Sequence, residues 1–262
     1  RLSLVGSEMC IRDRLCVMLA SALVLAAVAL VNYQGLASLF RNHHELRLMI
    51  VPSNYIGASV NYAREKVGVA SQPFRKMGED AALAPSWASH PRKSLTVLVV
   101  GESARAENFG LLGYSRDTTP QLSKEQGLLS FSNVTSCGTE TAVSVPCMFS
   151  GMTRKDYDAA RAKNQEGLLD MLQRAGLVVE WRDNQSGCKG TCDRVHFVDV
   201  SNLKEPGLCA DNECHDEILL KDLAARIDDL KQDTVLVLHQ MGSHGPDYYK
   251  RYPAAFERFT PV

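Results

Sequence analysis

The sequence predicts an α/β fold in which a doubly wound, mostly parallel sheet is flanked by helices and preceded by a transmembrane helix. Three short apolar runs rich in β-branched residues, at 95–100, 177–181 and 234–238, are typical of strands buried on both faces of a parallel sheet. Helical patterns at 167–175 and 214–231 lie between them. Strands that alternate with helices in this way indicate a doubly wound sheet.

Composition and charge limit the class of protein. Of the 262 residues, 45% are hydrophobic and 23% are charged, which excludes a disordered tail or a low-complexity polymer. The formal net charge is -1, and no basic run with interleaved aromatic residues is present. We therefore expect no nucleic-acid partner.

The N-terminal part of the chain contains a predicted membrane span. Residues 1–14 show no periodicity, and we interpret them as a non-native segment. Residues 15–40 are predicted to form a transmembrane helix, because the stretch 15–31 carries no charge and the mild stretch to Phe40 extends it to the thickness of the hydrocarbon core. A buried core helix or the apolar part of a signal peptide is the alternative interpretation.

A connector at 41–93 is expected to link the span to a globular domain at 94–262. Within it, an apolar pattern at 52–65 suits either an amphipathic helix at the membrane surface or a plain linker helix. The prolines of the stretch 81–91 indicate a linker just before the domain.

Polar residues that could carry chemistry follow the predicted strands or precede a helix. Glu102 follows the first strand, where a carboxylate suits a metal ligand, a general base or an ordinary helix-capping acid. Thr141 lies where a turn could enter a helix, and its hydroxyl suits a metal-activated nucleophile or an N-cap. His239 and His244 are expected together on a loop after the last strand, where they could bind metal, donate a proton or hold a phosphate.

Six cysteines form three close pairs. The pairs are Cys137 with Cys147, Cys188 with Cys192, and Cys209 with Cys214. Two of these spacings invite a zinc-finger interpretation, but a four-cysteine site would need two tight knuckles, and the first pair does not fit one. Three local disulfides fit better, and they indicate an oxidising compartment.

Together these segments resemble the lipid A phosphoethanolamine transferases, including the mobile colistin-resistance enzymes, of the alkaline phosphatase/sulfatase-like superfamily. The resemblance rests on VVGESARAENFGLLGYSRDTTP at 99–120, CGTETAVSVPCMFS at 137–150, WRDNQSGCKGTCD at 181–193 and LHQMGSHGPDYYKRYP at 238–253. It covers residues 15–262 in the right order, and it includes the connector FRNHHELRLMIVPSNYIGA at 40–58.

The resemblance implies a zinc enzyme of the bacterial inner membrane with its catalytic domain in the periplasm. Such an enzyme moves phosphoethanolamine from phosphatidylethanolamine to lipid A or another lipopolysaccharide phosphate. Glu102 matches a zinc-binding residue, and Thr141 matches the nucleophile that also contacts zinc. Ser186, Lys189 and His244 match positions that hold the phosphoethanolamine group. The three cysteine pairs match family disulfides.

One departure and two alternatives accompany this interpretation. The family completes its zinc site with an Asp-His pair and a further His downstream of the position of His244, and this sequence has neither. We interpret the sequence as truncated at both ends, and we expect this polypeptide to bind zinc weakly and to have little transferase activity.

The alternatives are a phosphodiester hydrolase or phosphoglycerol transferase of the same superfamily, and a non-catalytic membrane-anchored binding protein. A sulfatase proper is disfavoured, because the segment 144–148 lacks the Arg of the Cys/Ser-x-Pro-x-Arg motif.

Overall fold

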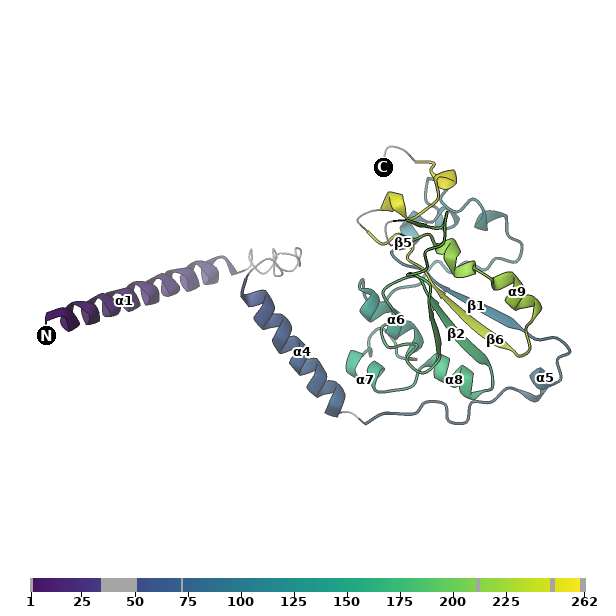
Figure 1. Ribbon diagram of the computed structural model, residues 1–262, viewed down its shortest axis with the longest axis horizontal. Coiled ribbons are helices and arrows are strands. Elements are labelled where there is room, and N and C mark those ends of the chain that lie inside the picture. The colour runs from purple at the N-terminus through teal and green to yellow at the C-terminus, as the bar shows by residue number, and fades with distance from the viewer. Residues whose placement is uncertain (1, 34–50, 72, 211–212, 246–247, 260–262) are drawn as a thin grey trace. The chain divides into compact units, whose positions relative to one another are not determined.

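The computed structural model of the chain describes residues 2–33, 51–71, 73–210, 213–245 and 248–259. The chain divides into two compact units, Arg1–Val67 and Gly68–Val262. The elements of both units are labelled in Figure 1.

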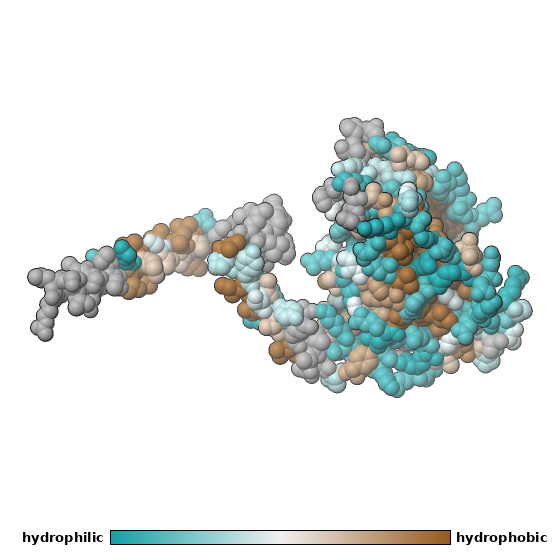
Figure 2. All heavy atoms as spheres, in the orientation of Figure 1, coloured by the Kyte–Doolittle hydropathy of each residue, from teal (hydrophilic) through white to brown (hydrophobic). Residues whose placement is uncertain are grey.

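The first unit contains two long helices, α1 (Leu2–Val31) and α4 (Ser53–Ser71). Helix α1 begins ahead of the predicted start of the span at residue 15, and the end of that span, residues 34–40, lies outside the described residues. Its stretch Asp13–Val31 is long and apolar enough to cross a membrane, with a mean hydropathy of 2.4. Figure 2 shows the exposed apolar side chains of this stretch in brown. Helix α4 covers the predicted helical pattern and continues past its expected end at residue 65.

A four-stranded parallel sheet with strand order β1-β6-β2-β3 lies at the centre of the second unit. The strands are β1 (Leu95–Val100), β2 (Val178–Asp183), β3 (His196–Asp199) and β6 (Thr234–His239). The three predicted strands are confirmed, and the sequence missed β3 because its four residues include only two apolar ones. In the sheet register His239 pairs with both Val100 and Asp183, so the carboxyl ends of β1, β6 and β2 lie at one edge.

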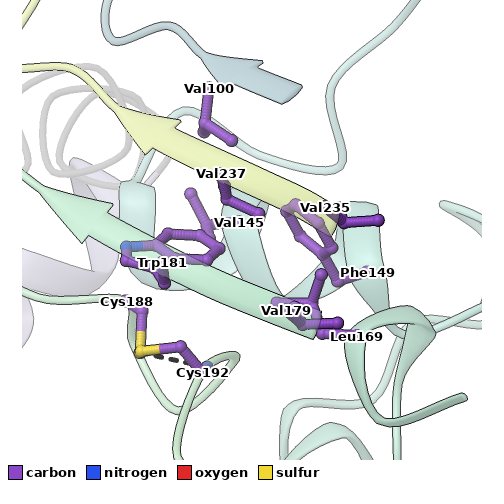
Figure 3. Close-up of a cluster of buried hydrophobic side chains, with 10 residues drawn as sticks. All are labelled: Val100, Val145, Phe149, Leu169, Val179, Trp181, Cys188, Cys192, Val235 and Val237. Atoms are coloured by element: carbon purple, nitrogen blue, oxygen red, sulfur yellow. Dashed lines mark hydrogen bonds between the residues drawn. A yellow bond between two sulfur atoms is a disulfide. The ribbon is translucent and has the colours of Figure 1, made fainter. Parts of the chain in front are cut away.

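The first face of the sheet packs against α6 (Thr141–Phe149) and α8 (Leu168–Arg174). Figure 3 shows this core, in which Phe149 meets Trp181 edge-on with ring centroids 5.6 Å apart. Leu169 of α8 is 1% exposed and packs in the same cluster. Helix α8 confirms the helix predicted at 167–175, since its apolar positions recur at helical spacing.

The second face packs against η4 (Asp216–Leu220), a 3-10 turn, and α9 (Leu223–Asp228). The single helix predicted at 214–231 is therefore wrong. Buried Arg182 explains the break, because its Nη1 donates to the carbonyls of Leu219 and Lys221 (2.9 and 2.8 Å), which an uninterrupted helix would use for its own bonds. Asp222 then adopts a left-handed backbone at the start of α9.

Short elements complete the second unit. The helices and strands are α5 (Pro85–Ala88), α7 (Ala159–Lys163), β4 (Cys209–Ala210) and β5 (Glu213–Cys214); the 3-10 turns are η1 (Ala106–Asn108), η2 (Gly110–Leu112), η3 (Leu122–Lys124), η5 (Tyr248–Lys250) and η6 (Ala254–Phe256). Strands β4 and β5 form an antiparallel hairpin. The described parts of the unit thus form a parallel sheet with helices on both faces, as the sequence predicts.

Candidate active site

Glu102 and Thr141 meet at the carboxyl edge of the sheet. Glu102 follows the end of β1, and Thr141 is the first residue of α6. The Thr141 hydroxyl donates a 2.7 Å hydrogen bond to Glu102 Oε2. The Glu102 side chain is 12% exposed, so the pair remains accessible from solvent while most of the carboxylate is covered. The two residues that the sequence singles out separately therefore share one site.

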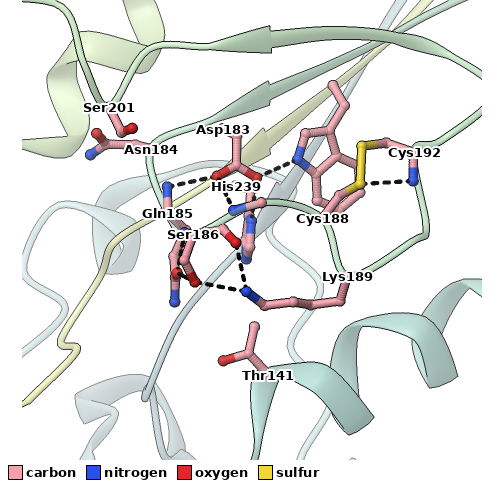
Figure 4. A network of polar contacts seen from close by, with 12 residues as sticks. Thr141, Asp183, Asn184, Gln185, Ser186, Cys188, Lys189, Cys192, Ser201 and His239 are labelled. Carbon is pink, nitrogen blue, oxygen red and sulfur yellow. Dashed lines mark hydrogen bonds and ion pairs between the residues drawn. A yellow bond between two sulfur atoms is a disulfide. The ribbon is translucent and has the colours of Figure 1, made fainter. Parts of the chain in front are cut away.

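Ser186 and Lys189 lie on the loop after β2 and connect to the same carboxylate through Gln185. Figure 4 shows the side chains of these three loop residues. Lys189 Nζ donates to the hydroxyl of Ser186 at 2.7 Å, and this hydroxyl in turn donates to Gln185 Oε1 at 2.7 Å. The other end of the amide, Gln185 Nε2, donates to Glu102 Oε2 at 3.1 Å. Sequence reasoning missed Gln185, since no pattern marks an amide that bridges two loops.

The loop after β6 places His244 against Glu102. His244 Nδ1 lies 3.9 Å from Glu102 Oε1, and half of the His244 side chain is exposed. The backbone N–H of Ser243 donates to the Glu102 carbonyl at 3.2 Å. Gly242 makes this approach possible, because a Cβ at its position would lie 2.6 Å from that carbonyl oxygen and its φ of +53° is in the left-handed region.

Asp216 holds the same loop from the second face of the sheet. Its two carboxylate oxygens accept the backbone N–H groups of Met241 and Gly242, at 2.8 and 2.9 Å. Asn184 Nδ2 also donates to Asp216, at 2.9 Å. Sequence reasoning missed Asp216 as well, because it was placed inside the long helix predicted at 214–231.

The electrostatics of the site favour an ionised Glu102. Burial acts to raise the pKa of Glu102, but the hydrogen bonds from Thr141, Ser103 and Gln185 act in the opposite direction. The nearby His244 ring adds to the lowering, and the net pKa of Glu102 lies below its ordinary value. A carboxylate that stays ionised can accept the Thr141 proton or bind a cation.

The sequence analysis expects His239 and His244 on one loop, and this expectation is wrong for His239. It is the last residue of β6 and is fully buried, with Nδ1 2.9 Å from Asp183 Oδ2. The parallel strand β6 continues to His239 because the backbone is paired on both sides, with β1 and with β2. Asp183 had a recognisable signal, since it comes two residues after the apolar run at 177–181, just as Glu102 comes two residues after the run at 95–100.

The donor set for a metal is incomplete within the described residues. Glu102 and Thr141 offer two oxygen atoms, and the described part of the chain contains no group of three His, Cys, Asp or Glu residues that could hold a metal ion. Structural and catalytic zinc sites use about three or four protein ligands. The residues present therefore fit a part of a zinc site, with hard oxygen donors of the kind that zinc accepts.

The three predicted cysteine pairs form disulfides. Cys137–Cys147 joins the segment before α6 to that helix, and Cys209–Cys214 joins β4 to β5. Cys188–Cys192 closes the loop that contains Lys189, and both of its cysteines are buried in the core of the first face.

Two family comparisons agree with this architecture. The sulfatase family model matches residues 94–262, and a model described as phosphoethanolamine transferase EptA/EptB matches residues 6–67. The second match begins within the segment that the sequence analysis sets aside as non-native. Because the first match covers more than half of the chain, the protein belongs to the sulfatase family.

Within this family the chain is similar to phosphoethanolamine transferases. It is 51% identical to phosphoethanolamine transferase EptA from Salmonella typhimurium, over 95% of this chain and 45% of that protein. It is 42% identical to phosphatidylethanolamine transferase Mcr-1 from Escherichia coli, over 86% of this chain and 43% of that protein.

A solved structure supports the same relation. The integral membrane protein lipooligosaccharide phosphoethanolamine transferase A (EptA) from Neisseria meningitidis superposes with a TM-score of 0.76 and is 44% identical. The superposition covers 90% of this chain and 44% of that one. The chain thus spans less than half the length of these three relatives.

Proposed function

We propose that the protein containing this chain transfers phosphoethanolamine from phosphatidylethanolamine to lipid A, or to another lipopolysaccharide phosphate, with Thr141 as the nucleophile. The observation that carries the proposal is the 2.7 Å hydrogen bond from Thr141 to Glu102 at the start of α6, in a chain similar to named phosphoethanolamine transferases. A hydroxyl bonded to a carboxylate can lose its proton as it attacks. The N-terminal end of α6, where Thr141 is the first residue, favours an anionic phosphoryl group beside it.

The reaction would proceed in two displacements. In the first, Thr141 Oγ1 attacks the phosphorus of phosphatidylethanolamine, the bond from phosphorus to the diacylglycerol oxygen breaks, and diacylglycerol leaves with the proton that Thr141 gave up. In the second, a phosphate oxygen of the acceptor attacks the same phosphorus, a P–O–P linkage forms and the bond to Thr141 breaks. Thr141 Oγ1 then regains a proton from the acceptor phosphate or from water.

The chain's own residues would bind zinc, the phosphoryl oxygens and the headgroup. Glu102 and Thr141 would hold zinc, which in this family lowers the pKa of the hydroxyl and offsets charge on the phosphoryl oxygens. Lys189 and Ser186 are bonded to each other at 2.7 Å, and they would bind phosphoryl oxygens with an ammonium and a hydroxyl group. His244, 3.9 Å from Glu102, would hold the headgroup from the loop after β6.

We further propose that α1 anchors the protein in the inner membrane and that the second unit works in the periplasm. The apolar stretch Asp13–Val31 supports the anchor. Three disulfides support an oxidising compartment for the second unit. An anchored domain would encounter both lipid substrates at the membrane surface.

Intact mass spectrometry tests the nucleophile. The gene product that contains residues 1–262 is purified in detergent and incubated with phosphatidylethanolamine and zinc. We expect a mass increase of one phosphoethanolamine that maps to the Thr141 peptide. Thr141→Ala should reduce the rate of adduct formation by at least about 1,000-fold, because the attacking oxygen is gone. Thr141→Ser should retain the adduct.

Thr139→Ala is the matched control, since Thr139 lies two residues earlier in the same segment. It should form the adduct as the unsubstituted protein does. Release of the headgroup without an adduct would instead favour a hydrolase. If no adduct forms and no headgroup is released, the result favours a non-catalytic binding protein. Either of these two results would overturn the proposed transferase mechanism.

A further inference from the structure

Asp183 joins three segments of the second unit through one carboxylate. It is the last residue of β2 and is 1% exposed. Its Oδ2 accepts the indole N–H of Trp181 at 2.8 Å and lies 2.9 Å from Nδ1 of His239 on β6. Its Oδ1 accepts the backbone N–H groups of Gln185 and Gly187, at 2.8 and 3.1 Å. The carboxylate therefore connects β2, β6 and the loop that follows β2 (Figure 4).

His239 is oriented by this carboxylate. The ring is fully buried and lies edge-on to Trp181, with centroids 5.3 Å apart and an interplanar angle of 68°. Its other nitrogen, Nε2, is buried without a hydrogen-bond partner among the described residues. Because Asp183 acts as an acceptor, the proton between the two side chains belongs on His239 Nδ1.

The four groups around Asp183 keep it ionised. Burial acts to raise the pKa of Asp183, but the hydrogen bonds from His239 and Trp181 outweigh this effect, and the pKa lies below its ordinary value. An ionised carboxylate accepts backbone N–H groups more strongly than a neutral one does. The turn from Asp183 to Gly187 is thus held by charge-assisted bonds.

The turn sets the direction of the side chains that follow. Gln185 is bonded to Asp183 through its backbone and to Glu102 through its side chain. The Ser186 hydroxyl donates a hydrogen bond to the Gln185 amide oxygen, and Lys189 Nζ donates one to the Ser186 hydroxyl. A rotation of the peptide at Gln185 would therefore move the Gln185 amide from the Glu102 carboxylate, and Ser186 and Lys189 with it.

We propose that Asp183, oriented by the Nδ1–H of His239, is a positioning residue that holds the loop Gln185–Lys189 in the geometry required to bind the headgroup of the lipid donor. The inference rests on the proposed function, because it assigns the loop to headgroup binding. His239 acts through Asp183 alone, and its Nε2 has no part in the reaction.

Two substitutions of His239 separate these roles. In His239→Asn, the amide nitrogen takes the place of Nδ1 and can still donate to Asp183. In His239→Gln, the amide reaches the place of Nε2 and the donor to Asp183 is lost. We expect His239→Asn to keep the KM for phosphatidylethanolamine within about threefold of the unsubstituted protein. We expect His239→Gln to raise this KM by about tenfold or more with kcat little changed, as loss of headgroup binding does.

Two further measurements report the loop itself. Amide hydrogen exchange of the peptide 184–188 should be as slow in His239→Asn as in the unsubstituted protein, and faster in His239→Gln. Trp87 and Trp181 are the two tryptophans of residues 1–262. In this chain with Trp87→Phe, Trp181 emission should shift in His239→Gln only. Both measurements are valid even when no transfer occurs.

The experiments distinguish a failure of the proposed function from a failure of the inference about Asp183. Failure of the unsubstituted protein to form the Thr141 adduct contradicts the proposed function, and the exchange data then decide whether Asp183 holds the loop. Retained binding in His239→Gln together with a loss in His239→Asn would show that Nε2 acts directly, and would overturn the inference. Equal exchange and equal KM in both variants would also overturn it.

Discussion

The two faces of the sheet bury carboxylates from the same strand, but they use them differently. Glu180 points to the face that carries η4 and α9, where Arg226 donates to its two oxygens at 2.5 and 2.6 Å and Arg182 donates at 3.0 Å. Asp183 lies on the opposite face and accepts bonds from an imidazole, an indole and two backbone N–H groups. One carboxylate is neutralised by guanidinium groups, and the other organises a loop.

The difference follows from the period of the strand. Side chains three residues apart in a strand point to opposite faces, so Glu180 and Asp183 cannot serve the same site. Glu180 joins α9 to the sheet through Arg226, and its side-chain hydrogen bonds within the described part of the chain go to Arg182 and Arg226. Asp183 lies at the carboxyl end of its strand, where the loops of a parallel sheet converge. Position along the strand and choice of face thus separate a structural carboxylate from a functional one.

The largest stability effect is expected on the second face. Glu180→Gln should lower the free energy of unfolding by about 3 kcal/mol, because it leaves the buried guanidinium of Arg182 without its carboxylate. Urea denaturation measures the change. The Thr141 adduct should form at an unchanged rate per folded molecule, and a loss of adduct formation would contradict the separation of the two faces.

Acid titration sharpens the same prediction. Burial raises the pKa of Glu180, but the bonds from Arg226 and Arg182 outweigh it, so the pKa lies below its ordinary value of 4.5. The contribution of Glu180 to stability is then complete above pH 4.5 and is lost as the pH falls through its folded-state pKa. Glu180→Gln should therefore make the free energy of unfolding depend less on pH in this range. Glu205→Gln, which breaks the partly exposed pair with Lys221, is the matched control and should have a much smaller effect.

The disulfides of the two faces provide the next comparison. Cys188–Cys192 and Cys209–Cys214 have sequence separations of 4 and 5, so their loop-closure contributions are nearly equal, at about 2 kcal/mol each. Replacing either pair by alanine should therefore lower the free energy of unfolding by a similar amount. Loss of the first pair should also raise the KM for phosphatidylethanolamine severalfold, since Lys189 lies inside that loop. Equal effects on KM would show that the disulfide does not help to place Lys189.

The last comparison concerns Gly242→Ala, on the loop that carries His244. Its new Cβ would lie 2.6 Å from the Glu102 carbonyl oxygen, so the loop that carries His244 must move away from the site. Gly151→Ala is the control, because Gly151 has a φ of +72° and nothing within 4 Å of the added atom. The left-handed backbone should cost each variant about 1 kcal/mol of stability, and the displaced loop should add to this cost in Gly242→Ala. Only Gly242→Ala should also slow adduct formation. A similar slowing in Gly151→Ala would show that the close approach of Gly242 to the Glu102 backbone does not explain the effect.

The sequence by itself determined three of the four strands of the parallel sheet and the separate parts of the site. Continuous β-branched runs are stable where both faces of a strand are covered, which is why β1 and β6 lie where they are predicted. Strand ends and a helix start marked Glu102 and Thr141, and the family resemblance added Ser186, Lys189 and His244. Local patterns carried no information about the break between η4 and α9, because the residue that causes it, Arg182, comes from a distant strand.

Only the tertiary structure decided how the parts meet. Glu102 and Gln185 are 83 residues apart, and Asp183 and His239 are 56 residues apart. The register of β2 against β6 places Asp183 directly beside His239, and no local property of either segment specifies that register. Long-range strand pairing therefore converts a strand-end Asp and a strand-end His into one buried unit, and aligns the loop beyond them with the nucleophile.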